Sequence, residues 1–525
     1  MANNIDVKEE IAVETGEIDA ASREYVYENR RYVGLKETVW FVVYDMCQSF
    51  NIDSFSGRFV TNILQIDLDY QTIINFVNGI WDVVNDIFTA AIVEKTRTRW
   101  GKFKPYLVAL GIPGTLGTCF YWLLPIFFKG KGSRDIGKFI TYFLLTIVRE
   151  GAGTFRAIAK TGMMATITPH PVDRTRLITV AEFFSGLLGE KLPQQILTVL
   201  LDLIGNKVVN LSYTSTFMFM GNFTSIVSGV AALVFCVMTR ERVMQSVETP
   251  SIVQGLKSVV NNKPILLLTL SETLSNLSIS GSMNDYYIDV LNFATMTIVA
   301  GIPGFLINPV AFYLVPWFRR HFSTRFLYIM SRYIYHFEDI FIYLVGMIGG
   351  KHNGLYKKVG PMLGVFMIRE TIFTVFYGVR CVIPSEMYNE SMDYCEWKNG
   401  YRTEAMTSVA RELTKKLASI INSTLSLQVK KLIGYDISSY TRGEAQTDTT
   451  KSGLFAMATI IPSLTGLIGV IPILFYDLSG EKRERMYAEL LKRRDEAAQV
   501  AASGDEEAIK ELAKKQMAVS ESSKK

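Results

Sequence analysis

A series of apolar runs, each long enough to form a bilayer-spanning helix, is the feature that most constrains what this chain can fold into. A transmembrane helix needs about 20 apolar residues in a row. Runs near that length lie at 38–64, 71–94, 105–128, 136–165, 176–205, 214–239, 263–291, 294–318, 324–349, 359–388, 404–434 and 453–477. They predict an all-α membrane protein with about twelve transmembrane helices.

The composition agrees with a membrane protein that crosses the bilayer many times. Of 525 residues, 49% are hydrophobic and only 20% are charged. A soluble chain of this length would divide into several domains and show fewer long apolar runs. The net charge of +5 lies mostly in loops and tails and reflects membrane topology. We therefore expect the lipid bilayer and a small molecule as partners, no nucleic acid, and a monomer.

The cysteines and histidines argue against a metal centre or a disulfide framework. The chain has five cysteines, an odd number scattered mostly through apolar runs, and only four histidines. Neither pattern gives the spacing of a metal site. The first 20 residues are acidic and polar, unlike a signal peptide, which favours a cytoplasmic N-terminus. We expect no cofactor and no enzyme activity.

A polar link divides the apolar runs into two sets of six. The basic links after the second, sixth and eighth runs are cytoplasmic by the positive-inside rule, although two exterior loops, 129–138 and 351–358, are also basic. Both termini then lie in the cytoplasm of a cell-membrane protein. The charge pattern of the C-terminal tail predicts a solvated helix in preference to a binding site for a partner. The predicted parts are an N-terminal tail at 1–34, a six-helix bundle at 35–240, a central loop at 241–262, a second bundle at 263–478 and a C-terminal tail at 479–525.

Acidic and amide side chains in the second run predict a cation site. Asp82 and Asp86 are four residues apart and share a helix face, with Asn85 between them. Carboxylates within a bilayer are costly and usually mark an ion or substrate path. Carboxylate and amide oxygens suit Na⁺, and a carboxylate can carry H⁺. The alternative is a structural pair that bridges to a basic group on another helix.

Basic side chains in three further runs are the second unusual feature. Arg149, Arg156 and Lys160 form one stripe of the fourth run, and they line a wet cavity or join an ion network with Asp82, Asp86 or Glu150. Further charged groups within the apolar runs include Arg369, Glu370 and Arg380 in the tenth, Arg411, Glu412, Lys415 and Lys416 in the eleventh, and the acids Glu182 and Glu272.

Two segments far apart in the chain resemble one transporter family. WDVVND at 81–86 with TRTRWGKFKPY at 96–106, and MDYCEWKNGYRTEA at 392–405, are similar to motifs of the glycoside–pentoside–hexuronide:cation symporters. The resemblance implies the major facilitator fold, two six-helix bundles and alternating access. It also implies that Asp82 and Asp86 bind the coupling cation, that Asn85 influences cation choice, that Thr154 is a cation ligand, and that Lys416 lies near both sites.

Departures from the family pattern bear on the substrate and the ion. Ile87 replaces the proline after the second acid, and a helix-four aspartate that serves cation and sugar in melibiose permease falls on Ala157. An arginine that contacts sugar there falls on Glu182. These changes remove the neutral-galactoside site and favour H⁺ over Na⁺. The added basic residues are Arg156, Lys160, Arg380, Arg411 and Lys415.

Because arginine binds carboxylates through paired donors, we expect cation-coupled symport of an anionic sugar such as a glucuronide or hexuronide. Two alternatives stay within the same fold: a symporter of neutral glycosides and an uncoupled facilitator. A polytopic membrane enzyme or a sensor is the alternative from another class, and no acid–base or metal constellation in the sequence supports an enzyme.

Overall fold

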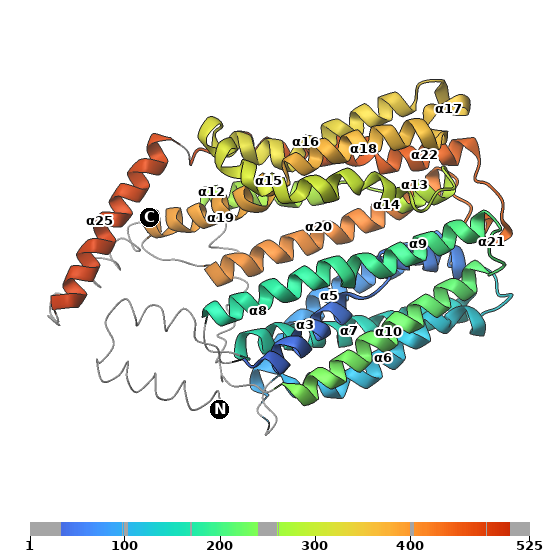
Figure 1. Cartoon of the computed structure of the whole chain (residues 1–525), viewed down its shortest axis with the longest axis horizontal. Helices are drawn as coiled ribbons and strands as arrows, with labels where there is room; N and C mark the ends of the chain where they lie inside the picture. Colours follow the sequence, from blue (N-terminus) through green and yellow to red (C-terminus); the bar gives the residue numbers. More distant parts are fainter. Residues whose placement is uncertain are drawn as a thin grey trace. The chain divides into compact units, whose positions relative to one another are not determined.

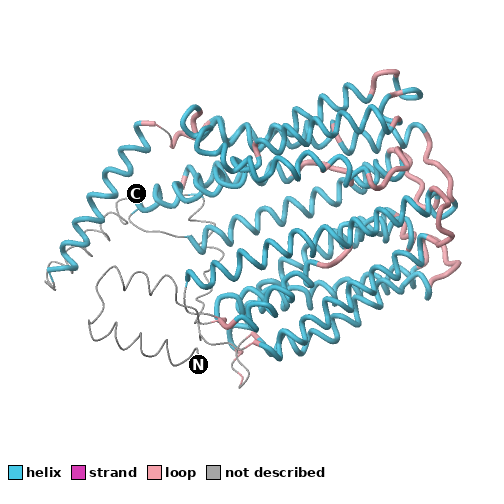
Figure 2. The backbone as a smooth tube through the Cα atoms, in the orientation of Figure 1, coloured by secondary structure: helices cyan, strands magenta, loops and turns pink. Residues whose placement is uncertain are grey.

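The computed structural model describes residues 33–96, 98, 103–167, 171–239, 260, 262–399, 404–478 and 480–503. Within these residues the secondary structure is helical, and no β-strand is present (Figure 2). The basic residues Arg97, Arg99 and Lys102, most of the N-terminal tail, residues 479 and 504–525 of the C-terminal tail, most of the central link, and residues 400–403 of the second family motif lie outside the described residues.

The described chain forms two compact units. The N-terminal unit holds residues up to 70 and within 81–249, and the C-terminal unit holds residues within 71–80 and 250–525. One helix, α5 (Leu68–Lys95), therefore contributes residues to both units. The division near residue 250 falls within the polar link that separates the two predicted sets of six runs.

In the N-terminal unit, α10 packs along both α6 and α3, and α6 packs along α7 (Figure 1). Aromatic side chains fill these contacts: the Tyr44 ring stacks on Phe235 at a centroid distance of 4.2 Å, and Phe59 meets Trp122 edge-on at 4.7 Å. Its helices are α3 (Leu35–Ser49), η1 (Asp53–Phe55), α4 (Ser56–Arg58), η2 (Phe59–Ile63), most of α5, α6 (Lys104–Phe127), α7 (Ile136–Thr166), α8 (Pro171–Phe184), η3 (Ser185–Glu190), α9 (Lys191–Gly205) and α10 (Tyr213–Met238).

The C-terminal unit is a second helical bundle, in which α16 packs on α18, α19 and α23, and α12 packs on α20 (Figure 1). Its first elements are α12 (Lys263–Asn276), α13 (Met283–Asp289), α14 (Met296–Ala300), α15 (Ile302–His321), α16 (Thr324–Gly346), α17 (Gly350–Asn353), η4 (Leu355–Lys357), α18 (Val359–Val375) and α19 (Tyr377–Asn399). The remainder are α20 (Glu404–Leu432), α21 (Ser439–Arg442), α22 (Asp448–Ala458), α23 (Ile460–Gly466), η5 (Leu467–Gly469), α24 (Val470–Leu474) and α25 (Glu481–Ser503).

A helix, or a run of helices with short breaks, occupies each of the twelve predicted segments. Among the described residues, four helical segments are long and apolar enough to cross a membrane, judged by length and composition alone. They are Lys104–Phe127, Tyr213–Met238, Met296–His321 and Asp448–Leu474. Val359–Val375 and Tyr377–Lys398, which meet at a 42° bend, make a fifth if counted as one span. The other segments carry more charge, as expected where helices face a polar interior.

The C-terminal helix α25 differs from the wholly solvated helix that its charge pattern predicted. Met486 and Leu490 are buried in the core of the C-terminal unit. The Trp397 indole of α19 donates a hydrogen bond to Glu489 at 2.6 Å, and Arg493 donates one to the Trp397 carbonyl at 2.9 Å. One face of α25 is therefore packed, because its two apolar side chains lie four residues apart on a single stripe.

The contact between α6 and α10 gives a test of the N-terminal packing. A Cβ atom on Gly221 would collide with the Trp122 ring, so Gly221→Ala should destabilise the protein by about 1–3 kcal/mol. Thermal unfolding in detergent measures the change. Gly117→Ala is the matched control, because a Cβ atom there meets no neighbouring atom. Equal stability of the two variants would contradict the close α6–α10 packing.

The docking of α25 should depend on pH. Because Arg485 and then the Trp397 indole donate hydrogen bonds to Glu489, the pKa of this carboxyl lies below its usual range. Its contribution to docking is complete above the unfolded pKa, about 4.3, and is lost as pH falls through the lower folded value. The protection of α25 amides against hydrogen exchange, taken relative to the intrinsic rate at each pH, should therefore fall in that acidic range. Glu489→Gln should remove the pH dependence and Glu484→Gln should keep it; persistence of the effect in Glu489→Gln would contradict the assignment.

Candidate functional site

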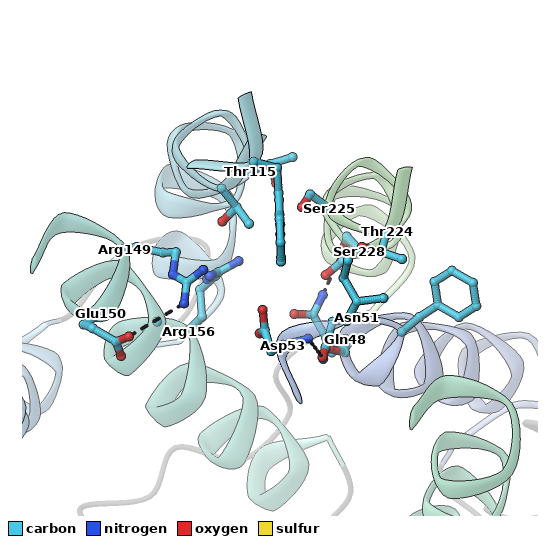
Figure 3. A pocket seen from close by; sticks show the side chains of 15 residues that line it. Gln48, Asn51, Asp53, Thr115, Arg149, Glu150, Arg156, Thr224, Ser225 and Ser228 are labelled. Carbon is cyan, nitrogen blue, oxygen red and sulfur yellow. Dashed lines mark hydrogen bonds and ion pairs between the residues drawn. The ribbon is translucent and has the colours of Figure 1, made fainter. Parts of the chain in front are cut away.

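A cavity of about 220 Å³ lies among α3, α6, α7 and α10 of the N-terminal unit. This space is larger than a single water needs, so it can hold a small organic ligand. Trp122 supplies an aromatic wall. The lining is otherwise rich in polar side chains, and Figure 3 shows them converging from four helices: Gln48, Asn51, Asp53, Thr115, Arg149, Glu150, Arg156, Thr224, Ser225 and Ser228.

The break after α3 brings three polar side chains to one wall of the cavity. The Gln48 amide donates a hydrogen bond to the Ser228 carbonyl at 3.1 Å, which ties the end of α3 to α10. The Asn51 side chain accepts a hydrogen bond from the Asp53 backbone at 3.0 Å. Short polar side chains that bond to nearby backbone compete with helix continuation, which explains why α3 ends here. The turn presents Asp53 to the cavity (Figure 3).

Two arginines of α7 face this wall. Arg149 and Arg156 are two helical turns apart and both line the cavity (Figure 3). The Arg149 guanidinium lies 4.3 Å from the centre of the Tyr121 ring and 4.0 Å from Glu150. Both arginines interact electrostatically with Asp53.

Part of each guanidinium is left without a partner. Among the described residues, one terminal nitrogen of Arg149 and Nε of Arg156 are buried and donate no hydrogen bond. A buried donor without an acceptor costs about 1–3 kcal/mol, and more when it is charged. The arrangement is therefore prepared to receive oxygen atoms of a ligand, above all those of an anion.

Lys160, the third member of the predicted stripe, has a different environment. It forms an ion pair with Asp45 of α3, and Asp45 is buried with 1% of its side chain exposed. Lys160 is absent from the cavity lining. Of the two roles that the sequence left open for it, the structure supports an ion network, with Asp45 as the partner instead of the acids that the sequence suggested.

The predicted cation ligands lie on α5 and α7. Asn85 is buried, accepts a hydrogen bond from Thr89 at 3.4 Å, and sits beside Gly151 of α7. Its amide nitrogen is buried without a hydrogen-bond partner among the described residues. Asp82 and Asp86 are half-buried on the same helix. Thr154 donates to the Glu150 carbonyl at 3.2 Å, one residue from Gly153 of the cavity.

The predicted substrate residues of the C-terminal unit are mostly engaged with other side chains. Arg411 donates two hydrogen bonds to Glu272, one of them at 2.6 Å, and Lys415 pairs with Glu412 at 2.9 Å and with Glu272 at 3.7 Å. Arg380 lies 3.7 Å from the centre of the Phe373 ring. Lys416 is half-buried and Glu182 of α8 is exposed.

The predicted site residues do not include Gln48, Asn51 and Asp53, which interrupt the first apolar run. The hydroxyl groups of α6 and α10 that line the cavity were also missed. A single polar residue within an apolar run was the available signal, and it does not reveal which helices will meet.

Most of the chain matches a known family. A model of the family described as MFS/sugar transport protein matches residues 33–480. The chain belongs to this family. This membership confirms the predicted major facilitator fold, and the relatives confirm the resemblance to glycoside:cation symporters. A solved structure supports the fold independently: a bacterial homolog of the human lysosomal transporter Spinster, with a TM-score of 0.51 at 12% identity, covers 87% of this chain and 97% of its own.

Two curated relatives align over most of their length. The glucuronide carrier protein homolog of Escherichia coli K12 is 23% identical over 431 residues, covering 79% of this chain and 86% of the relative. The isoprimeverose transporter of Lactiplantibacillus pentosus is 22% identical over 432 residues, covering 80% and 83%. The relatives are transporters, as expected for a multi-pass membrane protein.

The Asp45–Lys160 pair gives a test of whether Lys160 is structural. Lys160→Met should destabilise the protein by about 3 kcal/mol, because it leaves the buried Asp45 carboxylate unpaired. The double variant Asp45→Asn with Lys160→Met should recover most of that loss. Thermal unfolding of the two single variants and the double variant measures the coupling. Additive losses would show that the two side chains do not interact.

Proposed function

We propose that this protein is a cation-coupled symporter of an anionic sugar or glycoside, and that Arg149 and Arg156 bind the acidic group of the substrate. The observation that carries the proposal is the pair of α7 guanidiniums in one cavity, each with a buried N–H group that has no acceptor among the described residues. A carboxylate would supply the missing oxygens through charge-assisted hydrogen bonds. Trp122 adds apolar aromatic surface to the lining.

The remaining cavity groups suit a sugar. Asp53, Gln48 and Asn51 offer acceptors and an amide, and the hydroxyl groups of Thr115 and Ser225 can donate or accept. A glucuronide combines a carboxylate, which suits the two arginines, with several hydroxyl groups, which suit the other polar groups of the lining. The relative named as a glucuronide carrier homolog and another named as a putative sulfoquinovose importer support an anionic substrate.

We assign the coupling cation to α5 and α7. Asp82 and Asp86 supply charge, and Asn85 and Thr154 supply neutral oxygens. A cation bound there would reduce the repulsion between the two carboxylates and favour substrate binding, which is how the two sites would be linked energetically. A relative named as a putative glycoside/cation symporter supports the coupling, with H⁺ and Na⁺ both compatible with these ligands. The protein would act in the cell membrane as a monomer with both termini in the cytoplasm.

The second candidate is a transporter of neutral glycosides. The relative named as an isoprimeverose transporter favours it. In that case Asp53 and Glu150 would balance the two arginines, and the cavity would bind its ligand through hydroxyl and amide groups alone. An uncoupled facilitator would share this cavity and would ignore ion gradients.

Arg156→Gln distinguishes the two substrate classes. It removes a charge-assisted contact worth about 1.5–3 kcal/mol, so binding of an acidic glycoside should weaken about ten- to a hundredfold while a neutral analogue changes little. Calorimetric titration of purified protein with a glucuronide and the matching neutral glucoside measures both.

Arg134→Gln is the control, because Arg134 is an exposed arginine that pairs with Asp67 outside the cavity. It should leave both affinities unchanged. Equal losses for the acidic and neutral ligands in Arg156→Gln would overturn the anion proposal and favour the neutral glycoside.

A further inference from the structure

A second buried charged cluster lies in the C-terminal unit, where α16, α18 and α19 meet. Asp339 of α16 is 4% exposed and forms an ion pair with Arg369 of α18 at 2.9 Å. Arg380 of α19 lies 3.7 Å from the centre of the Phe373 ring of α18, and Arg369 lies 5.8 Å from the same ring. The cluster thus joins three helices around one aromatic side chain.

Glu338 lies beside Asp339 on α16. Within this cluster it is the carboxylate whose negative charge no direct contact compensates. Both of its carboxylate oxygens are shielded from solvent, and neither has a hydrogen-bond partner among the described residues. Arg369 is the positive charge that acts most strongly on Glu338, but it forms an ion pair with Asp339. An ionised carboxylate buried without hydrogen bonds costs several kcal/mol, and such groups neutralise themselves by taking up a proton.

The charged groups that act on Glu338 lie on three helices. Asp339 on its own helix, Arg369 and Glu370 on α18, and Arg380 on α19 all interact with it electrostatically. Three further groups surround the cluster: Tyr335 and Arg332 of α16 and Tyr287 of α13. Among the groups that act on Glu338 directly, Arg369 and Arg380 are therefore shared between its carboxylate and those of Asp339 and Glu370.

We infer that Glu338 is a proton-binding group of the transport cycle, a cation site in the C-terminal unit that is separate from the acids of α5. The inference rests on the proposed symport and names H⁺ as a coupling ion. The carboxylate takes one proton from water when the cluster opens to one side of the membrane. Enclosure without hydrogen-bond donors favours the neutral acid, and the O–H bond breaks again when the cluster opens to the other side. No other bond changes.

Glu338→Gln tests this role, because glutamine copies the shape of the neutral acid and cannot release a proton. In full-length protein reconstituted into liposomes, glycoside accumulation driven by a pH gradient should fall at least tenfold. Exchange of labelled for unlabelled glycoside at equal concentrations should persist, because exchange needs no net proton movement. Glu338→Asp keeps a carboxyl and should retain part of the accumulation. Glu444→Gln, at an exposed loop carboxylate, is the control that should behave as wild type.

Infrared spectroscopy gives a readout that does not depend on transport. Wild-type protein at neutral pH should show a carbonyl band of a protonated, buried carboxylic acid, and Glu338→Gln should lack it. If the glutamine variant is unstable, Glu338→Asp replaces it in this measurement, because the aspartate should shift the carbonyl band.

Normal proton-driven accumulation by Glu338→Gln, or an unchanged band, would overturn the inference and leave the cluster as a structural ion network. The inference would also be overturned if Asp86→Asn lost proton coupling while Glu338→Gln kept it in full. That result would assign the proton to α5 alone. Absence of glycoside transport by the wild-type protein would instead contradict the proposed function, while the infrared band would still test the protonation of Glu338.

Discussion

The free-energy cost of placing charge away from water governs this structure. Lys160 with Asp45, Arg411 with Glu272 and Arg369 with Asp339 each join two helices through a buried or half-buried ion pair. Removing one partner would leave the other charge unpaired, which costs more than the pair contributes. Such pairs therefore fix which helices may lie together, within a bundle whose apolar surfaces alone would allow many arrangements.

Both proposed sites lie where this compensation is incomplete. The N-terminal cavity leaves guanidinium donors of Arg149 and Arg156 unsatisfied, and the C-terminal cluster leaves the Glu338 oxygens unsatisfied. The cavity lacks hydrogen-bond acceptors, so it suits an anionic ligand. The C-terminal cluster lacks donors for Glu338, so it suits a proton. Buried polar groups with unmet hydrogen bonds are costly, so a ligand that completes them gains that energy on binding.

Irregular helices place these groups. The first helix stops at Ser49, and the turn that follows carries Asn51 and Asp53 into the cavity. The bend of 42° between α18 and α19 lies between Arg369 and Arg380. Breaks of this kind are tolerated at membrane depth where they line a polar interior, and transporters commonly build their binding sites from them.

The sequence by itself determined the helical segments and the family, because hydropathy and motif spacing are local properties of the chain. It also predicted that Arg149 and Arg156 share a face, since helical periodicity alone decides that. Only the tertiary structure decided which charged groups pair. Lys160 follows the same stripe yet binds Asp45, and Gln48 reaches Ser228, 180 positions further along the chain. Partner choice depends on which helices pack together, and periodicity within one helix carries no information about its neighbours.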